Sequence, residues 1–371
     1  MSEHELVELY RRLHCSAERS HEEQKTSATI LGVLQETGPD ALHPRWGGHG
    51  IVAEYRGRAP GPTVLLRSEL DALPGSHAGG AEHRCGHDGH MAILSGVANH
   101  LGNRRPDTGR VALLFQPAEE TGEGARQMLE DERFAEIEPD WVFALHNLPG
   151  YPEGEVLVRA GTFAHGSRGL AFTLTGATAH AAEPERGRSP APAVAELITA
   201  LTKEDSALPE GARATVIHVR VGEIAFGTTP GEGVVMVTLR ASTDRALDRI
   251  AATVHRLAAG IADAHGLRLD AEDHEPFPAT LNAPEAVDIV RAAARAAGRP
   301  VRELTRPFGW SEDFGHFTRR FRGALFGLGS GEDRPALHHP EYVFPETLLV
   351  PGVQVFDRLI AILCGKDREP V

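Results

Sequence analysis

The segment Val111-Ala112-Leu113-Leu114-Phe115-Gln116-Pro117-Ala118-Glu119-Glu120 joins an unbroken apolar run to a polar turn with two carboxylates. A continuous apolar run of this length is typical of a parallel strand that helices cover on both faces. A second segment, Trp141-Val142-Phe143-Ala144-Leu145-His146-Asn147, repeats the pattern. The two segments therefore predict buried strands whose carboxyl ends carry polar side chains.

Strands and helices alternate through the first part of the chain. Strands are predicted at Ile51–Tyr55 and Thr63–Leu66, and a buried helix is predicted at Met91–Leu101. Ser20 and Glu23 have the spacing of a capping box, so a further helix is predicted to begin at Ser20. This alternation predicts an α/β fold in which a doubly wound mixed sheet has helices on both faces.

The pattern changes after residue 166, where one strand, one helix, two strands, one helix and one strand follow in turn. This β-α-β-β-α-β order is the ferredoxin-like arrangement. The first alternation resumes near Pro278. The predicted organisation is a catalytic domain made of residues 1–166 and 276–371, with an inserted ferredoxin-like α+β domain at residues 167–275 that serves as a lid and dimerisation domain.

Composition limits the classes of partner and the compartment. The 371 residues carry a net charge of −14, which disfavours nucleic acid or an anionic membrane as the main partner. The sequence contains no unbroken run of about 18 apolar residues, so no membrane span is predicted. Met1–Glu5 lacks the basic and apolar regions of a signal peptide, so none is predicted. The three cysteines, Cys15, Cys85 and Cys364, predict reduced thiols and a cytoplasmic location.

The loop Cys85-Gly86-His87-Asp88-Gly89-His90 places one thiol, two imidazoles and one carboxylate next to one another. Thiolate and imidazole are ligands of zinc and similar transition metals. The glycines allow the backbone to bend so that Cys85 and His87 can face one centre. A loop without metal also accommodates these residues, so the metal interpretation depends on ligands from distant parts of the chain.

Three distant segments offer such ligands, and each has a plainer alternative. Glu119-Glu120 could be a solvated acidic loop, His146 could be structural, and Leu337–Pro340 could be a surface turn. Because open α/β sheets carry their sites at the carboxyl ends of the strands, we expect these groups to converge. Two divalent ions, roughly 3.5–4 Å apart in two-metal hydrolases, suit such a set. The predicted ligands are Cys85, His87, Glu120, His146 and His338.

These motifs resemble those of the co-catalytic metallopeptidases related to aminoacylases and carboxypeptidase G. The most similar branch contains hippurate hydrolases, indole-acetyl-amino-acid hydrolases and N-acyl-L-amino-acid amidohydrolases. The matching motifs run in family order over nearly the whole chain: Arg11–His14, Asp71–Pro74, Cys85–His90, Gln116–Glu120, His146-Asn147, Gly176–Ala181, Glu312–Phe314, and Leu337-His338 with Pro340.

The resemblance implies a role for each site residue. Cys85 would be the shared ligand of two metal ions, and Glu119 would be the general base that takes a proton from water and passes it to the leaving amine. Asp71 would orient a metal ligand. His180, in the inserted domain, would polarise the scissile carbonyl and reach the site of a partner subunit, which implies a functional homodimer. Asn147 and Arg240 would bind substrate, Arg240 by clamping a carboxylate.

Two positions depart from the pattern of this branch. Glu69 stands where the branch has aspartate, and one extra methylene could shift a contact behind the metal ligands. Gly227-Thr228-Thr229-Pro230 replaces an Asn-x-x-Pro segment whose asparagine binds substrate in relatives. Because Gly227 has no side chain, that contact must be absent or must come from another group.

The sequence thus predicts a metal-dependent amidohydrolase that cleaves N-acyl amino acids to a carboxylic acid and a free amino acid. The metal would be zinc, manganese, cobalt or nickel, all of which accept such ligands. A dipeptidase or carboxypeptidase with the same metal centre is the alternative enzyme. A binding protein that kept the fold without catalysis is the alternative of another class, and the presence of Glu119 argues against it.

Overall fold

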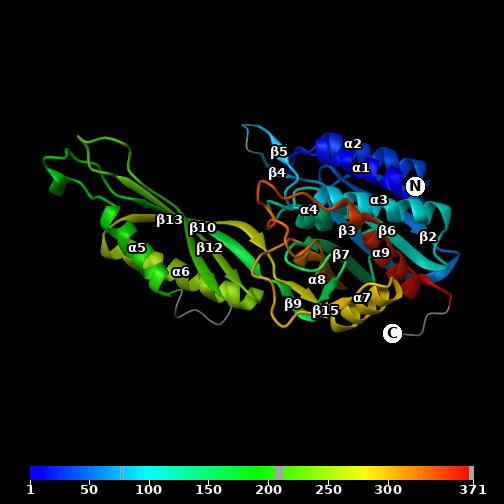
Figure 1. Cartoon of the computed structure of the whole chain (residues 1–371). Coiled ribbons are helices and arrows are strands. Elements are labelled where there is room, and N and C mark those ends of the chain that lie inside the picture. Colours follow the sequence, from blue (N-terminus) through cyan, green and yellow to red (C-terminus); the bar gives the residue numbers. More distant parts are fainter. Residues whose placement is uncertain (76, 78, 205–211, 367–371) are drawn as a thin grey trace. The chain divides into compact units, whose positions relative to one another are not determined.

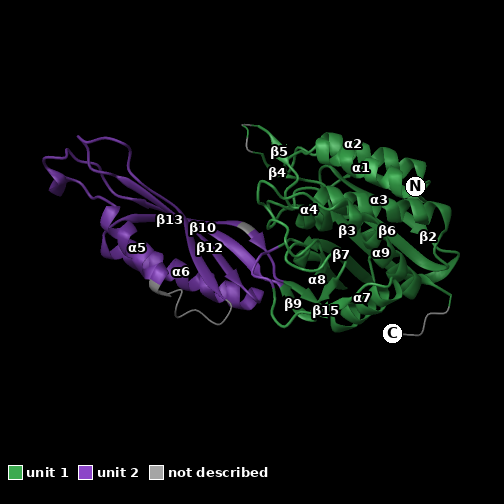
Figure 2. Cartoon of the chain, in the orientation of Figure 1, with its two compact units in different colours: residues 1–163, 280–307, 312–371 green, residues 164–279, 308–311 purple. Residues whose placement is uncertain are grey.

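The structure, a computed structural model, describes residues 1–75, 77, 79–204 and 212–366 (Figure 1). The chain forms two compact units, which Figure 2 colours separately. Unit 1 contains Met1–Phe163, Thr280–Pro307 and Glu312–Val371, and unit 2 contains Ala164–Ala279 and Phe308–Ser311. Unit 2 is therefore inserted into the chain of unit 1.

Unit 1 contains a mixed eight-stranded sheet. The central strands β6, β3, β7 and β16 are parallel neighbours, so their carboxyl ends meet at one edge. Strand β2 is antiparallel to β6, and strand β8 is antiparallel to β16. The strand order is β1 (Ala41–Trp46), β2 (Gly50–Arg56), β6 (Thr108–Gln116), β3 (Ala59–Glu69), β7 (Trp141–Leu148), β16 (Arg322–Gly329), β8 (Val156–Val158) and β15 (Val301–Glu303).

Helices cover both faces of this sheet. Alternate strand residues, among them Leu66, Leu113 and Phe143, join one core with the helices of the first face. Those helices are α1 (Glu3–Cys15), α2 (Gln24–Glu36), α3 (His87–Asn103), α7 (Pro284–Ala296) and α9 (Leu349–Cys364). Two short helices, α4 (Gly124–Glu130) and α8 (Gly315–Thr318), contact each other and the strands β6 and β16 on the other face. The predicted fold class is confirmed.

Short elements complete unit 1. Two small sheets pair β4 (Leu73–Pro74) with β5 (Ala81–Glu82) and β9 (Gly161–Ala164) with β14 (Thr280–Asn282). Two 3-10 helices, η1 (Glu132–Glu136) and η3 (Glu346–Leu348), precede β7 and α9.

The predicted start of the second helix at Ser20 is wrong, because α2 begins at Gln24. The two residues of the expected capping box bind distant groups instead. The Ser20 hydroxyl donates to Asp71 Oδ2 at 2.7 Å, and Glu23 Oε1 accepts from the Ala118 amide at 2.8 Å. Tertiary contacts at the strand ends have thus replaced the local cap.

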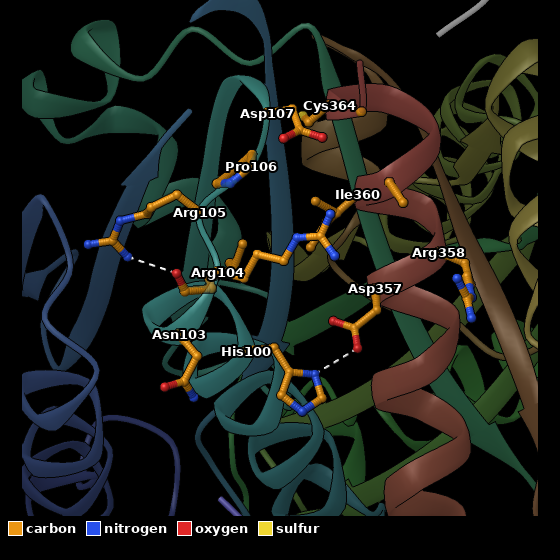
Figure 3. Close-up of a pocket in the computed structure, with 13 residues that line it drawn as sticks. His100, Asn103, Arg104, Arg105, Pro106, Asp107, Asp357, Arg358, Ile360 and Cys364 are labelled. Carbon is orange, nitrogen blue, oxygen red and sulfur yellow. Dashed lines mark hydrogen bonds and ion pairs between the residues drawn. The ribbon is translucent and has the colours of Figure 1, made fainter. Parts of the chain in front are cut away.

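Helix α9 is a core element of unit 1. Together with η3 it forms the one segment, Glu346–Cys364, that is long and apolar enough to cross a membrane among the described residues. Most of its buried side chains belong to the same core as α1, α3 and α7. Figure 3 shows its second half, which carries Asp357 to Cys364, near the end of α3, where His100 Nδ1 and Asp357 Oδ2 lie 2.7 Å apart and line a pocket.

Unit 2 has the ferredoxin-like topology. Its four-stranded sheet is antiparallel throughout, in the order β11-β12-β10-β13. Helix α6 presents Leu247, Ile250 and Val254 to the sheet at the spacing of an amphipathic helix. The elements in chain order are β10 (Gly166–Thr175), η2 (Pro184–Arg186), α5 (Ala191–Glu204), β11 (Arg213–Val221), β12 (Glu232–Ala241), α6 (Asp244–Ala264) and β13 (Arg268–Phe277).

Candidate metal centre

Polar side chains of unit 1 gather at the carboxyl edge of its parallel strands. Strand β3 leads to Asp71, β6 leads to Glu119 and Glu120, and β7 carries His146 near its end. The amino terminus of α3 brings His87 to the same edge. The fold thus collects residues that the sequence distributes from position 71 to position 146.

Cys85, His87 and His146 form a buried group whose possible ligand atoms all lie within 4.8 Å of one another. Cys85 Sγ and His146 Nε2 are 3.6 Å apart. His87 Nδ1 lies 3.0 Å from the Asp71 carbonyl oxygen, and His146 Nδ1 lies 2.9 Å from the Asn147 carbonyl oxygen. If each Nδ1–H donates to its carbonyl, both Nε2 atoms are left as acceptors, which is the state that binds a metal.

Glu119 and Glu120 lie beside this group. Glu119 Oε2 is 3.7 Å and Glu120 Oε1 is 3.9 Å from His87 Nε2. The Glu120 amide donates to Asp71 Oδ2 at 3.0 Å, so Asp71 contacts both His87 and the carboxylate loop. Ala118, which precedes the pair, has a left-handed φ of 50°. That turn directs the two neighbouring carboxylates toward the imidazole.

His338 completes the set from the far end of the chain. Its Nε2 lies 3.9 Å from Glu120 Oε2, and it forms a possible ligand group with Cys85 and Glu120. The His338 amide donates to the Arg84 carbonyl at 2.9 Å, which ties this loop to the residue before Cys85. His338 also adopts a left-handed φ of 68°. Its side chain is the most exposed of the five predicted ligands.

Burial without a cation disfavours the ionised forms of these groups. Burial, and then Glu120 and Glu312, raise the pKa of Glu119 well above its usual range. Burial, and then Asp71, raise the pKa of Glu120 to about 7 against the opposing effect of His87. Burial and the neighbouring His90 lower the pKa of His146 to about 3. A divalent cation would compensate this crowding of acceptors.

The donor set fits such a cation. Two of its buried polar atoms, His87 Nε2 and Glu120 Oε1, make no hydrogen bond within the described residues, and neither does Oδ1 of the neighbouring Asp71. An unsatisfied buried polar group is costly, and a bound ion is one of the few partners that satisfies several at once. One thiolate, imidazole nitrogens and carboxylate oxygens also match zinc, manganese, cobalt and nickel.

Residues behind the ligands make hydrogen-bond contacts whose partners the sequence did not predict. His14 Nδ1 lies 2.7 Å from Asp88 Oδ2, which links α1 to the start of α3. His90 Nδ1 lies 2.8 Å from Glu69 Oε2, so glutamate at position 69 makes a direct contact here. Asn147 is fully buried, and its amide contacts His90 and the Tyr342 hydroxyl. Four of these residues stand in the motifs quoted above, and that position was the sequence signal that could have pointed to them: His14, Asp88, His90 and Asn147.

The remaining two predicted residues belong to unit 2. His180 is exposed, and its segment is joined to the loop of Gly227, because the Ala181 amide donates to the Gly227 carbonyl at 3.0 Å. A Cβ added at Gly227 would meet nothing within 4 Å. Arg240 Nη1 donates to Ser311 Oγ at 2.8 Å. The structure thus brings the five predicted ligands and Glu119 together in unit 1 and places His180 and Arg240 in unit 2.

The sequence is similar to known hydrolases over almost its full length. The pattern of the peptidase family M20/M25/M40 matches residues 65–362. An N-acetyl-L-cysteine deacetylase of Bacillus subtilis is 31% identical over 366 residues, which cover 94% of this chain and 85% of that protein. A hippurate hydrolase of Campylobacter jejuni is 27% identical over 368 residues, which cover 96% and 95%.

Solved structures show the same architecture. A dinuclear metal-binding peptidase of Bacillus subtilis superimposes with a TM-score of 0.82 at 25% identity, over 98% of both chains. A putative aminohydrolase of methicillin-resistant Staphylococcus aureus superimposes with a TM-score of 0.86 at 25% identity, over 98% of this chain and 96% of that one.

Proposed function

The chain belongs to the peptidase family M20/M25/M40, and from this premise we propose that it hydrolyses N-acyl amino acids to a carboxylic acid and a free amino acid. It is a metallo-hydrolase by family. The relatives named as a deacetylase of N-acetyl-L-cysteine and as a hippurate hydrolase support the finer assignment, because both substrates are N-acyl amino acids. The observation that carries the proposal is the position of Glu119, whose Oε2 lies 3.7 Å from His87 Nε2, an atom that makes no hydrogen bond within the described residues.

We assign up to two divalent ions to the five predicted ligands. When bound, such ions supply Lewis acidity to the scissile carbonyl and lower the pKa of water. The chemistry of the donors supports the assignment, since a thiolate and a carboxylate can each be shared between two ions. The proposed ligands are Cys85, His87, Glu120, His146 and His338.

Glu119 is the proposed general base. It accepts a proton from the attacking water while the oxygen bonds to the acyl carbon, and it then delivers that proton to the amide nitrogen as the carbon–nitrogen bond breaks. Its burial and its neighbouring carboxylates raise its pKa, which makes this carboxylate a stronger proton acceptor than an exposed glutamate. Asp71 keeps His87 and the Glu120 amide in place.

Groups outside the ligand set are assigned to substrate. His180 would stabilise the developing oxyanion, and Arg240 would bind the carboxylate of the amino acid through its planar guanidinium. The expected substrate contact of Asn147 stays a prediction, because its amide already contacts His90 and Tyr342. Gly227 offers no side chain to a substrate, and a Cβ added there would meet nothing within 4 Å.

We also propose that the protein is a cytoplasmic homodimer that assembles through unit 2. Strand β11 is an edge strand of the sheet, and edge strands offer unpaired backbone groups to a second copy. Ile217 and Val219 on this strand are exposed, and Ile224 and Phe226 in the following loop are fully exposed. Exposed apolar residues gathered on one edge are typical of an interaction surface. In this dimer His180 would serve the partner's site.

A substrate screen tests the function. Protein loaded separately with zinc, manganese, cobalt or nickel is incubated with N-acetyl and N-benzoyl amino acids and with dipeptides, and free amino acid is measured. We expect hydrolysis of N-acyl amino acids, and a loss of at least about 10²-fold in kcat in E119Q with metal retained. Hydrolysis of dipeptides alone would favour the peptidase, and binding without hydrolysis would contradict the enzyme proposal.

A further inference from the structure

We propose that Asp313 is a positioning residue for Glu119, because it fastens both ends of the loop that carries the base. The inference rests on the proposed role of Glu119. The loop leaves strand β6 at Gln116 and enters helix α4 at Gly124, with Glu119 and Glu120 between these points. Asp313 lies far away in sequence, just before helix α8, and is completely buried.

The contacts of Asp313 define the clamp. At the start of the loop, the side-chain nitrogen Nε2 of Gln116 donates to Asp313 Oδ1 at 2.9 Å and to Asp313 Oδ2 at 2.7 Å. At its end, the Ala125 backbone amide donates to Asp313 Oδ2 at 2.9 Å. One carboxylate therefore holds the last residue of the strand and the first turn of the following helix. This single side chain bridges the two loop ends, in addition to the backbone bond from the Gly124 amide to the Ala118 carbonyl at 3.0 Å.

Arg67 holds this carboxylate in turn. Its Nη2 donates to Asp313 Oδ1 at 2.6 Å, and its Nε donates to Gln116 Oε1 at 2.9 Å. Arg67, Gln116 and Asp313 thus form a closed ring of hydrogen bonds, and all three side chains are buried. Satisfied polar networks in a low-dielectric interior rigidify the backbone that they bind.

The loop itself has little freedom to relax between the two fastened ends. Ala118 is in the left-handed region, and its amide donates to the buried Glu23 carboxylate at 2.8 Å. A Cβ added at Gly124 would lie 1.6 Å from the Pro117 carbonyl oxygen, so the loop passes close to its own start. A shift of about 1 Å in a reacting group can reduce turnover by about 10²-fold. Loss of the Asp313 contacts should therefore displace the Glu119 carboxylate.

The variant D313N tests the clamp with almost no change in size. Asparagine offers one acceptor oxygen and one donor nitrogen, so a donor must face either Ala125 N–H or Arg67 Nη2. We expect kcat to fall by at least about tenfold while KM changes less than about threefold and bound metal falls by less than kcat, because only Glu120 of the five proposed ligands lies on the clamped loop. Loss of metal in proportion to activity would overturn the proposal.

A matched variant separates positioning from general loss of stability. Asn282 is also buried in unit 1, and it bonds the Leu325 backbone amide at 2.8 Å and carbonyl at 2.7 Å. N282D should lower the melting temperature yet keep kcat near the wild-type value. If N282D and D313N lose equal activity for equal loss of stability, Asp313 is a structural residue only.

The double variant Q116E/D313N provides a rescue. The carboxylate introduced at position 116 accepts from Arg67 Nε and from the amide introduced at position 313, so it restores one lost pairing and keeps the net charge. We expect it to recover part of the kcat lost in D313N, and no recovery would contradict the clamp. Should D313N fail to fold, Q116M releases one end of the loop while Asp313 keeps its bond to Arg67.

Hydrogen exchange gives a measurement that does not depend on catalysis. In D313N, peptides covering residues 117–125 should exchange faster by at least about tenfold, whereas peptides from α3 should not change. In N282D the loop should exchange as in the wild type. Unchanged exchange of residues 117–125 in a folded D313N would overturn the clamp. If the wild-type protein hydrolyses no substrate, the proposed function is refuted. The hydrogen-exchange comparison of D313N with the wild type then still tests whether Asp313 holds the loop.

Discussion

Left-handed backbone conformations mark the residues that hold the candidate metal ligands. Gly86 between Cys85 and His87 has φ 97°, Ala118 before Glu119 has φ 50°, and His338 has φ 68°. Non-glycine residues seldom adopt this region, and they persist there only where surrounding contacts impose it. The strain thus lies where separate loops must direct their side chains to one point.

Gly86 gives a prediction at the scale of one residue. A Cβ at this position would lie 2.3 Å from Asn147 Oδ1, and its φ is unfavourable for any other residue. We expect G86A to lower the free energy of unfolding by more than about 2 kcal/mol and to reduce bound metal, because Cys85 must move. Thermal unfolding and elemental analysis measure both effects.

Gly32 provides the control for that substitution. It lies in the interior of α2, where an added Cβ meets nothing within 4 Å. G32A should therefore stabilise the protein by about 0.5–1 kcal/mol, as alanine does in helices. A G86A protein with wild-type stability and full metal content would show that the Cys85 loop is not constrained as described.

At the scale of elements, apolar runs were sufficient to place the central strands. Val111–Phe115 and Trp141–Leu145 lie in β6 and β7, because strands buried on both faces carry continuous apolar residues. The edge strand β1, which contains Pro44, lacks that signal and was not predicted. The start of α2 was misplaced, since Ser20 and Glu23 bind Asp71 and Ala118 and do not cap the helix.

The edge strand β11 carries the prediction about assembly. Because His180 would serve the site of the partner, mixing inactive H180A with inactive E119Q should restore activity as subunits exchange. A mixed dimer contains one site with an intact base and an intact histidine, so up to about half the sites of each mixed dimer regain activity. Turnover of an N-acyl amino acid before and after exchange measures the effect.

The interface itself needs separate variants. I217E places a charge on the exposed apolar edge of β11 and should reduce the dimer fraction measured by light scattering. It should also reduce the activity that returns when H180A and E119Q are mixed. L281E changes a similarly exposed apolar residue of β14 in unit 1 and should leave the dimer intact. Mixed dimers that form without any return of activity would show that His180 does not act across the interface.

At the scale of the whole molecule, the candidate site combines residues from Asp71 to His338 that share no local pattern. The sequence predicted the candidate ligands because imidazole and carboxylate stand where strands end, and because the Cys85–His90 loop adds a thiol and further imidazoles. Apart from Asp71, it did not predict the residues that contact these candidate ligands from behind. The contacts of Asp313 with Gln116 and Ala125, and of His14 with Asp88, depend on how distant segments pack, and side-chain chemistry alone does not show which partners meet.

The central claim is that one set of donors in this chain, largely buried except for His338, binds divalent metal. Purified protein is saturated with zinc or manganese, freed of excess ion, and analysed for metal per chain. C85S is compared with C364S, which also replaces a buried thiol but lies in α9, away from the ligands. We predict up to two ions in the wild type and in C364S, and fewer in C85S. Equal and near-zero metal in all three proteins would contradict the claim.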